Sequence, residues 1–204
     1  MTKATYRKKA LPHLLNDFDK RCAYCLDPNE FRHPSQDQVD HFNCKLPERK
    51  RHQYENLMLA CAACNLSKHD KVVVNPHDHD QRLLNCTVEN EFDGHIIEEK
   101  DGHWVSTTKA GEYHITSIEL DHQCHQKKRA ARRQMAENLL ALCTTALQYQ
   151  AHNPEEVHKQ IMELSKAILS QLDNFPPLLV EGRTITAKEW LKSKGVDLVS
   201  DNLS

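Results

Sequence analysis

The sequence predicts an α+β fold in which a small metal-stapled unit is followed by a mostly helical C-terminal region. Two Cys-x-x-Cys pairs, Cys22/Cys25 and Cys61/Cys64, indicate a metal site in the first third of the chain. From residue 115 onward, apolar residues recur at helical spacing. With 204 residues, the chain is long enough for one large domain or for a small domain with an appended one.

The composition is typical of an ordered protein, with 39% hydrophobic and 27% charged residues and five glycines. The amino terminus lacks the apolar stretch of about 7 to 15 residues that a signal peptide needs, and no window approaches the roughly 18 apolar residues of a membrane span. We therefore expect a cytoplasmic protein without membrane contact. Because thiols stay reduced in that compartment, eight cysteines favour metal over disulfides.

The two cysteine pairs are separated by 35 residues, a spacing that allows four thiolates to converge on one Zn²⁺. A closed four-sulfur site has no open coordination position, so the expected zinc is structural. The other four cysteines have no paired spacing and are interpreted as core or incidental thiols: Cys44, Cys86, Cys124 and Cys143.

In the first half of the chain we expect a lead-in helix over residues 5–18, with Pro12 as a boundary or kink. A strand over residues 57–59 should lead into the second cysteine pair, which opens a helix. Residues 72–115 are expected to be irregular apart from a small hairpin around residues 92–97 and 104–108.

In the second half, apolar spacing predicts helices over residues 115–150 and 154–172, which could pack as a hairpin. The tail reads as an extended piece and then a threonine-capped short helix from Ala187, which Gly195 ends.

Charge is distributed unevenly along the chain. Residues 1–71 hold 13 Lys/Arg and 9 Asp/Glu, a net charge of +4, whereas the remainder holds 14 and 20, a net charge of −6. A basic first part fits contact with phosphate, with Lys45 and Lys68 as candidate substrate-binding residues. The acidic, amphipathic helical part is assigned to partner docking. Solvated charge without a special purpose is the alternative interpretation.

A basic cluster in the predicted helix over residues 115–150 has three interpretations: it tracks nucleic acid, it binds an acidic partner surface, or it is a solvated helix face. Its members are Lys127, Lys128, Arg129, Arg132 and Arg133.

Asp40 and His41 lie between the knuckles, and Asn65 directly follows the last cysteine. A phosphodiester-cleaving enzyme needs a base that activates water and a hard cation that stabilises developing charge. Imidazole supplies the first, while carboxylate and amide oxygens suit Mg²⁺ or Mn²⁺. Because consecutive strand residues point to opposite sides, a sharp turn is expected at His41 if Asp40 and His41 are to face one phosphate.

The segments CAYC, VDH, Asn56 followed by LMLAC, and CAACNLSK together resemble the HNH, or ββα-metal, nuclease motif in its zinc-knuckle form. The resemblance implies that His41 is the general base, that Asn56 holds the loop and orients the base, and that Asp40 and Asn65 bind the catalytic divalent ion. Position 65 is His in many members, so this chain is an HNN variant. Products with 5′-phosphate and 3′-hydroxyl ends are implied.

More narrowly, DHFNCK, YENLMLACAACNLSKHDK and NPHDHD are similar to the PtuB-like HNH subunit of Septu-type and retron-associated antiphage systems, over roughly residues 15–135. Cys44 stands where that group usually has Pro, and Tyr54 where it often has Trp. The resemblance implies an ABC-like or SMC-like ATPase partner (PtuA-like), and it admits a retron reverse transcriptase with its RNA and DNA as a further partner.

The expected organisation is therefore a zinc-knuckle HNH nuclease core over 1–75, a connector with a small hairpin over 76–115 and a helical partner-docking region over 116–204. The expected function is endonucleolytic hydrolysis of DNA or of RNA such as tRNA. The alternatives are a non-catalytic zinc module that binds nucleic acid or protein, and a redox protein, which two Cys-x-x-Cys pairs without a βαβ context do not favour.

Overall fold

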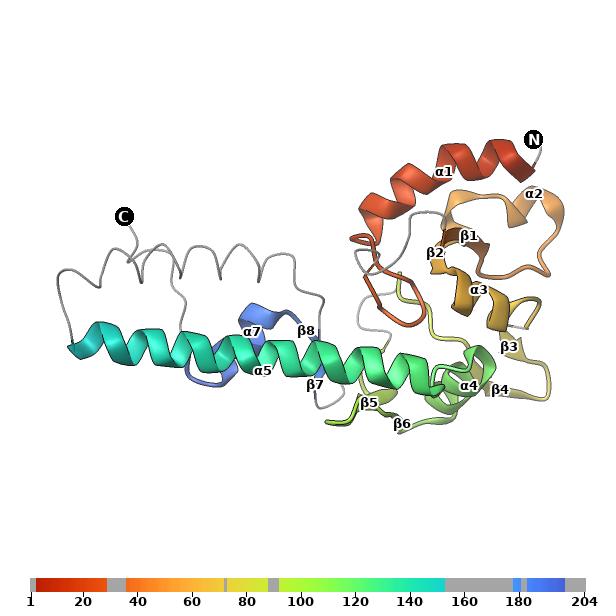
Figure 1. The fold of residues 1–204 in the computed structure, drawn as a ribbon. Helices are drawn as coiled ribbons and strands as arrows, with labels where there is room; N and C mark the ends of the chain where they lie inside the picture. The colour runs from red at the N-terminus through yellow and green to blue at the C-terminus, as the bar shows by residue number, and fades with distance from the viewer. Residues whose placement is uncertain are drawn as a thin grey trace.

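The computed structural model describes residues 3–28, 36–71, 73–87, 92–152, 178–180 and 183–196. It confirms the α+β class: short helices and strands alternate through the first part of the chain, and one long helix, α5 (Gln123–His152), extends away from them (Figure 1).

The N-terminal unit is a strand–loop–strand–helix arrangement. Strand β1 (Asp37–His41) pairs antiparallel with β2 (Leu57–Cys61), and α3 (Ala62–Lys68) begins directly after β2. The connecting loop contains α2 (Glu48–Arg51) and η3 (Tyr54–Asn56). Helix α1 (Lys3–Asp17) continues past Pro12, which is therefore not a helix boundary.

Helix α1 packs on the strand pair through a small apolar cluster. Leu14 of α1 and Leu57 and Leu59 of β2 share this cluster, and each is at most 5% exposed. The contact covers the β1–β2 pair from one side, so the candidate site residues of β1 stand on a packed support.

The middle of the chain is more ordered than expected. It contains a hairpin of β3 (Val74–Asn75) and β4 (Asp78–Arg82), a second hairpin of β5 (Ile96–Glu98) and β6 (Trp104–Ser106), and α4 (Lys109–Ile118). The second hairpin was predicted, but β3 and β4 were not, and α4 begins at Lys109, before the helix predicted from residue 115. Polar sequences such as NPHDHD form a hairpin here because β4 packs against α4, a contact that local periodicity does not encode.

The single helix predicted over residues 115–150 is two helices. Glu119 adopts a left-handed conformation (φ 57°), which ends α4 after Ile118. The Leu120 amide then donates to the Ile115 carbonyl, and the Leu120 side chain is fully buried. Burial of Leu120 against the core compensates for the left-handed Glu119 backbone, so tertiary packing overrides the helical pattern.

The tail agrees with its prediction. Strands β7 (Leu178–Val180) and β8 (Arg183–Ile185) pair, and α7 (Ala187–Ser193) begins with a capping box between Thr186 and Glu189. Gly195 follows with φ 80°. The helix predicted over residues 154–172 lies outside the described residues.

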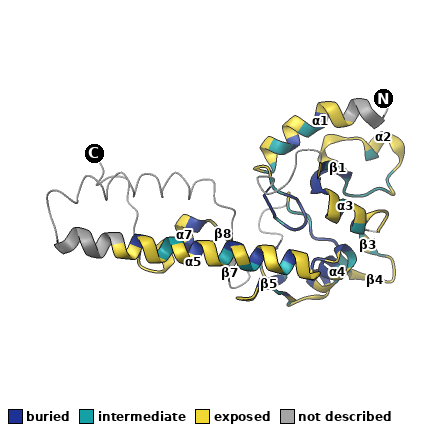
Figure 2. Ribbon diagram, viewed as in Figure 1, coloured by how far each residue is buried: buried dark blue, intermediate teal, exposed yellow. Residues whose placement is uncertain are grey.

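Apolar packing continues across residue 75, the end of the HNH nuclease core expected from the sequence. One cluster unites the cysteine knuckles with residues from 83 to 120, including Leu84, Ile96, Trp104 and Ile118. A second cluster joins the later part of α5 to β7 and α7. The buried positions of both are visible in Figure 2.

No helix in the described part of the chain is both long enough and apolar enough to span a membrane.

His114 links α4 to the first knuckle and to residue 84 from a fully buried position. The Leu84 amide donates to His114 Nδ1 over 3.1 Å, and His114 Nε2 lies 3.5 Å from the Tyr24 carbonyl oxygen. Burial lowers the pKa of His114 to about 4. The ring is therefore neutral in the folded protein at pH 7, with its proton on Nε2.

We predict that His114 makes stability fall as pH falls. The folded-state pKa lies below the ordinary value near 6.5, so between these values the unfolded chain binds the extra proton. About 3 kcal/mol should be lost as pH drops from above 6.5 to about 4. Urea unfolding at pH 7.5 and pH 5, with zinc content followed in parallel, measures the slope.

His114→Asn keeps an acceptor for the Leu84 amide and should flatten this pH slope, whatever its absolute stability. His77→Asn, at an exposed position, is the matched control and should keep the wild-type slope. An unchanged slope in His114→Asn would show that other groups carry the pH dependence.

Candidate functional site

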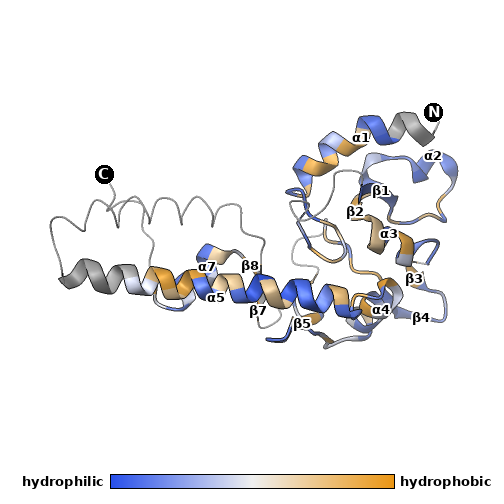
Figure 3. Cartoon of the chain, viewed as in Figure 1, coloured by the Kyte–Doolittle hydropathy of each residue, from blue (hydrophilic) through white to orange (hydrophobic). Residues whose placement is uncertain are grey.

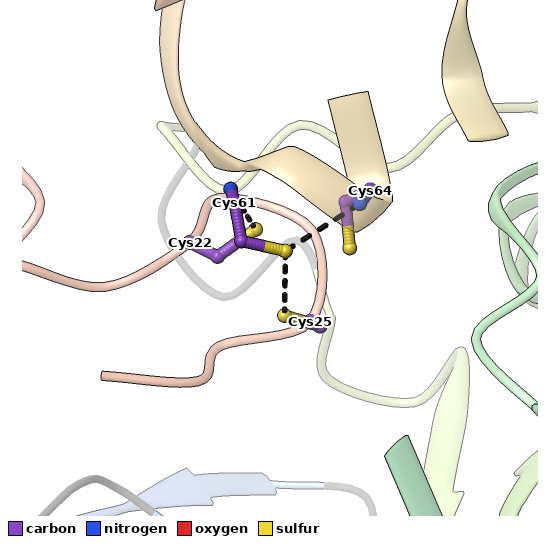
Figure 4. Close-up of side chains that lie close together, drawn as sticks. All are labelled: Cys22, Cys25, Cys61 and Cys64. Carbon is purple, nitrogen blue, oxygen red and sulfur yellow. Dashed lines mark hydrogen bonds between the residues drawn. The ribbon is translucent and has the colours of Figure 1, made fainter. Parts of the chain in front are cut away.

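Four buried cysteines meet where the two knuckles face each other (Figure 4). The sulfurs of Cys22, Cys25, Cys61 and Cys64 all lie within 4.8 Å of one another. This confirms the convergence predicted from the spacing.

The geometry fits zinc. A tetrahedral Zn²⁺ with Zn–S bonds of about 2.3 Å places its sulfurs about 3.8 Å apart, and Cys25 Sγ and Cys61 Sγ are 3.9 Å apart. The Cys61 amide donates to Cys22 Sγ, and the Cys64 amide donates to Cys61 Sγ, as expected of thiolate acceptors. The four cysteines would hold a structural ion with no position open to substrate.

Protonation in the cluster is uneven. Hydrogen bonds with Cys22 first, and then with Cys25 and Cys64, lower the pKa of the Cys61 thiol. Hydrogen bonds with Cys22 and then with other thiols of the cluster raise the pKa of Cys25 and of Cys64 well above their ordinary value. A metal ion must therefore displace protons from buried thiols, so loading will weaken as pH falls.

Asp40 is buried and its Oδ2 atom has two close partners. Lys68 Nζ lies 2.8 Å away, and the Tyr24 hydroxyl donates to the same oxygen over 2.5 Å. Lys68 Nζ also donates to the His41 carbonyl oxygen over 2.8 Å. Tyr24 comes from the first knuckle and Lys68 from α3, so both halves of the cysteine site hold Asp40.

The position of Lys68 differs from the expectation. Its side chain is 0% exposed, so the ammonium does not reach the surface to contact a substrate phosphate. Ion pairing with Asp40 compensates for burying this charge, which would otherwise cost several kcal/mol. In the structure, Lys68 instead holds the Asp40 carboxylate and the backbone carbonyl of His41.

His41 ends β1 and is half-buried. Its Nε2 lies 3.0 Å from Nδ1 of His52, with the rings edge to face at 4.9 Å between centroids. Burial, followed by the nearby His52, lowers the pKa of His41. The ring therefore stays neutral, and able to accept a proton, down to a lower pH than an ordinary histidine.

The sharp turn expected at His41 is absent. Strand pairing continues through His41, which lies opposite Leu57, while Asp40 lies opposite Met58. Since alternate side chains of a strand point to opposite faces, Asp40 meets Tyr24 and Lys68 inside while His41 meets His52.

Asn56 ties down the loop that follows His41. Its Oδ1 accepts from the Asn43 amide over 2.9 Å, and its Nδ2 donates to the carbonyls of Asn43 and Arg51. The Phe42 amide donates to the Asn56 carbonyl. These hydrogen bonds hold the loop and the backbone next to His41, the candidate base.

The other two candidates, Asn65 and Lys45, lie on α3 and in the loop that follows β1. Asn65 is half-buried on α3, one turn before Lys68 on the same helix face. Lys45 is exposed, and its ammonium is 3.1 Å from Asp70. Lys45 is therefore accessible to a ligand, and its present partner is a solvent-exposed carboxylate.

Residues 22–71 match the family model described as HNH endonuclease. These residues form an HNH domain. The match covers 50 of the 204 residues and includes both knuckles, β1, β2 and α3. No curated protein and no solved structure matches the chain.

Sequence reasoning missed two residues of the HNH domain. Tyr24 sits inside the first Cys-x-x-Cys pair, where a polar aromatic residue in a buried motif signals a buried hydrogen-bond partner. His52 lies in the loop between the strands, and only the loop conformation fixed by Asn56 brings it to His41. No sequence signal indicates that pairing.

The basic cluster on α5 is not a solvated helix face. Arg129 is 0% exposed, stacks on Trp104 at 4.5 Å and donates to the Gly102 and Leu120 carbonyls. Arg132 donates to the Glu98 carboxylate over 2.9 Å. Of the five members, Lys127 and Lys128 are exposed and Arg133 is half-buried, so the cluster acts mainly within the molecule.

We predict one zinc ion per chain, lost in Cys61→Ser. Structural zinc contributes on the order of 10 kcal/mol to small zinc modules, so this variant should also lose the cooperative unfolding of the HNH domain. Metal analysis and thermal unfolding with and without chelator measure both effects. Cys124→Ser, at an exposed thiol outside the cluster, is the matched control and should keep its zinc. Full zinc content in Cys61→Ser would refute the assignment.

Proposed function

We propose that the protein is a metal-dependent endonuclease that hydrolyses phosphodiester bonds of nucleic acid, with His41 as general base. The observation that carries the proposal is a half-buried, neutral imidazole whose flanking backbone is fixed on both sides, within residues that match the HNH endonuclease model. A zinc module that only binds has no use for a histidine held in this way.

In the reaction, His41 accepts a proton from a water molecule as the water oxygen forms its bond to phosphorus. The bond from phosphorus to the 3′ oxygen breaks, the leaving oxygen takes a proton from solvent, and the phosphate stays on the 5′ side. A divalent ion such as Mg²⁺ or Mn²⁺ would supply charge stabilisation at the scissile phosphate. Asp40 and Asn65 offer the hard oxygen atoms to hold it.

The contacts of Asp40 restrict how it would take part. Its Oδ2 atom is shared by Lys68 and Tyr24, so Oδ1 is the oxygen available for an ion. Lys68 and Tyr24 are positioning residues in this proposal, because they fix the carboxylate without reaching the substrate. The exposed Lys45 and the α2 residues Arg49 and Lys50 form a basic rim suited to phosphate.

We further propose that the chain is the nuclease subunit of an antiphage complex with an ABC-like or SMC-like ATPase and, in retron-associated forms, a reverse transcriptase with its RNA and DNA. The sequence resemblance to PtuB-like subunits supports this, as does the need to restrain a nuclease in the cytoplasm. The described part of α5 carries large apolar side chains that are half exposed, Met135 at 50% and Leu142 at 54%. They are seven residues apart and share one helix face, which suits partner docking.

We predict that His41→Ala stays folded and zinc-loaded but cleaves about 10²- to 10⁴-fold more slowly, the usual contribution of a general base. Cleavage of plasmid DNA and of total RNA, with Mg²⁺ or Mn²⁺ and with or without chelator, measures the rate and distinguishes the substrates. His79→Ala, exposed on β4, is the control and should cleave normally. A His41→Ala protein as fast as wild type would remove the mechanism.

For the partner, we predict that Leu142→Glu weakens co-purification of the full-length chain with a candidate ATPase, because a charge replaces exposed apolar area on α5. Leu66→Glu changes a 76% exposed leucine on α3 and should leave the complex intact. The reverse outcome, loss with Leu66→Glu alone, would assign docking to the HNH domain.

A further inference from the structure

Helix α5 presents basic side chains at buried positions where it crosses the HNH domain. The buried positions follow one stripe, His125, Arg129, Arg132, Ala136 and Cys143. The stripe is basic in the first half of the helix and apolar in the second, as the burial and hydropathy views show (Figures 2 and 3). Burying cations is costly unless anions face them, so the first half requires an anionic surface.

That surface begins at Asp27, two residues after Cys25 and only 5% exposed. Its carboxylate lies 3.3 Å from Lys128 Nζ, 3.8 Å from Arg132 Nη1 and 3.9 Å from His125 Nδ1. The Cys25 sulfur, one carboxylate oxygen of Asp27 and one ring nitrogen of His125 all lie within 4.8 Å of one another. The basic face of α5 therefore converges on the edge of the sulfur cluster.

The other carboxylate on this face is Glu98, which contacts Arg132 and Arg133. Asp27 and Glu98 together form ion pairs with three cations of α5, Lys128, Arg132 and Arg133, whereas the buried Arg129 donates to backbone carbonyls. Within the described residues, Arg129 Nη1 and Arg132 Nε are buried without a hydrogen-bond partner.

The sulfur cluster next to Asp27 is a further source of negative charge. Four thiolates around one Zn²⁺ carry a net charge of −2, because four negative charges outweigh two positive ones. With the thiols mostly protonated, the cluster would be less negative and the cations on α5 would be less well compensated.

We infer that the basic face of α5, formed by Lys128, Arg129 and Arg132, is the counter-charge of the zinc tetrathiolate, so that zinc binding and docking of the first half of α5 stabilise each other. The coupling is reciprocal, because the factor by which docking of α5 strengthens zinc binding equals the factor by which zinc binding strengthens docking of α5. The second half of α5 is held by the apolar cluster with Leu178, Trp190 and Leu191 and does not share this dependence.

The ionisation of Lys128 agrees with this arrangement. Burial alone lowers its pKa, but Asp27 and, more weakly, the thiols of Cys25 and Cys61 outweigh burial and raise it.

Transfer of zinc from the full-length protein to an excess of chelator tests the inference. Lys128 is half exposed, so Lys128→Met should fold and should lose zinc on the order of tenfold more readily, as is usual for residues that support metal ligands. Lys128→Arg keeps the charge and should match wild type. Lys127→Met removes an exposed charge from the adjacent position and should also match wild type.

Equal zinc loss from Lys128→Met and Lys127→Met would overturn the inference, as would loss from Lys128→Arg equal to that from Lys128→Met, since the effect would then be one of shape. Neither measurement uses cleavage, so the result is independent of the proposed nuclease activity.

Hydrogen exchange provides the reciprocal measurement. Removing zinc from the wild-type chain should reduce amide protection at least tenfold over residues 125–133 and leave residues 136–143 largely protected. Unchanged protection over 125–133, or equal loss over both halves, would contradict separate anchoring of the two halves.

Discussion

The convergence of four sulfurs from two knuckles determines where the chemically important side chains of this protein lie. The knuckles are 35 residues apart in sequence, and closing a loop of that length costs about 3 kcal/mol of chain entropy before any contact is made. The bound ion would offset that cost. Tyr24 belongs to the first knuckle and Lys68 to the helix of the second, so their meeting at Asp40 is a direct result of the same closure.

Two buried charge networks involve residues of the knuckles that hold the sulfur cluster. In one, Lys68 pairs with Asp40 next to the candidate base. In the other, Asp27 gathers basic residues from α5. A buried pair that loses one partner costs about 3 to 5 kcal/mol, so opening a knuckle would disrupt both networks together. The HNH domain and the start of α5 thus form one electrostatic unit across the expected domain boundary.

The sequence predicted those parts of the site that short-range spacing encodes. The Cys-x-x-Cys pairs, the strand before the second pair and the helix after it follow from local pattern. The role expected of Asn56 came from the family resemblance and not from spacing, and the structure shows the hydrogen bonds by which Asn56 holds its loop. Burial of Lys68 and Arg129 could not be predicted, because a charged residue is buried only when a distant partner compensates for it. The same holds for the break at Glu119, where burial of Leu120 overrides a helical pattern.

Opposite orientation of Asp40 and His41 is compatible with a shared reaction because their connection is rigid. Lys68 donates to the His41 carbonyl and binds the Asp40 carboxylate, while Asn56 fixes the Phe42 amide on the other side. The backbone around His41 is therefore held, whereas its ring contacts the exposed His52. In the proposed reaction the imidazole would turn toward a bound phosphate, exchanging its contact with His52 while the Asp40 carboxylate stays in place. A fixed backbone with an adjustable ring would then allow a base and an oxygen ligand on opposite faces of β1 to serve one scissile bond.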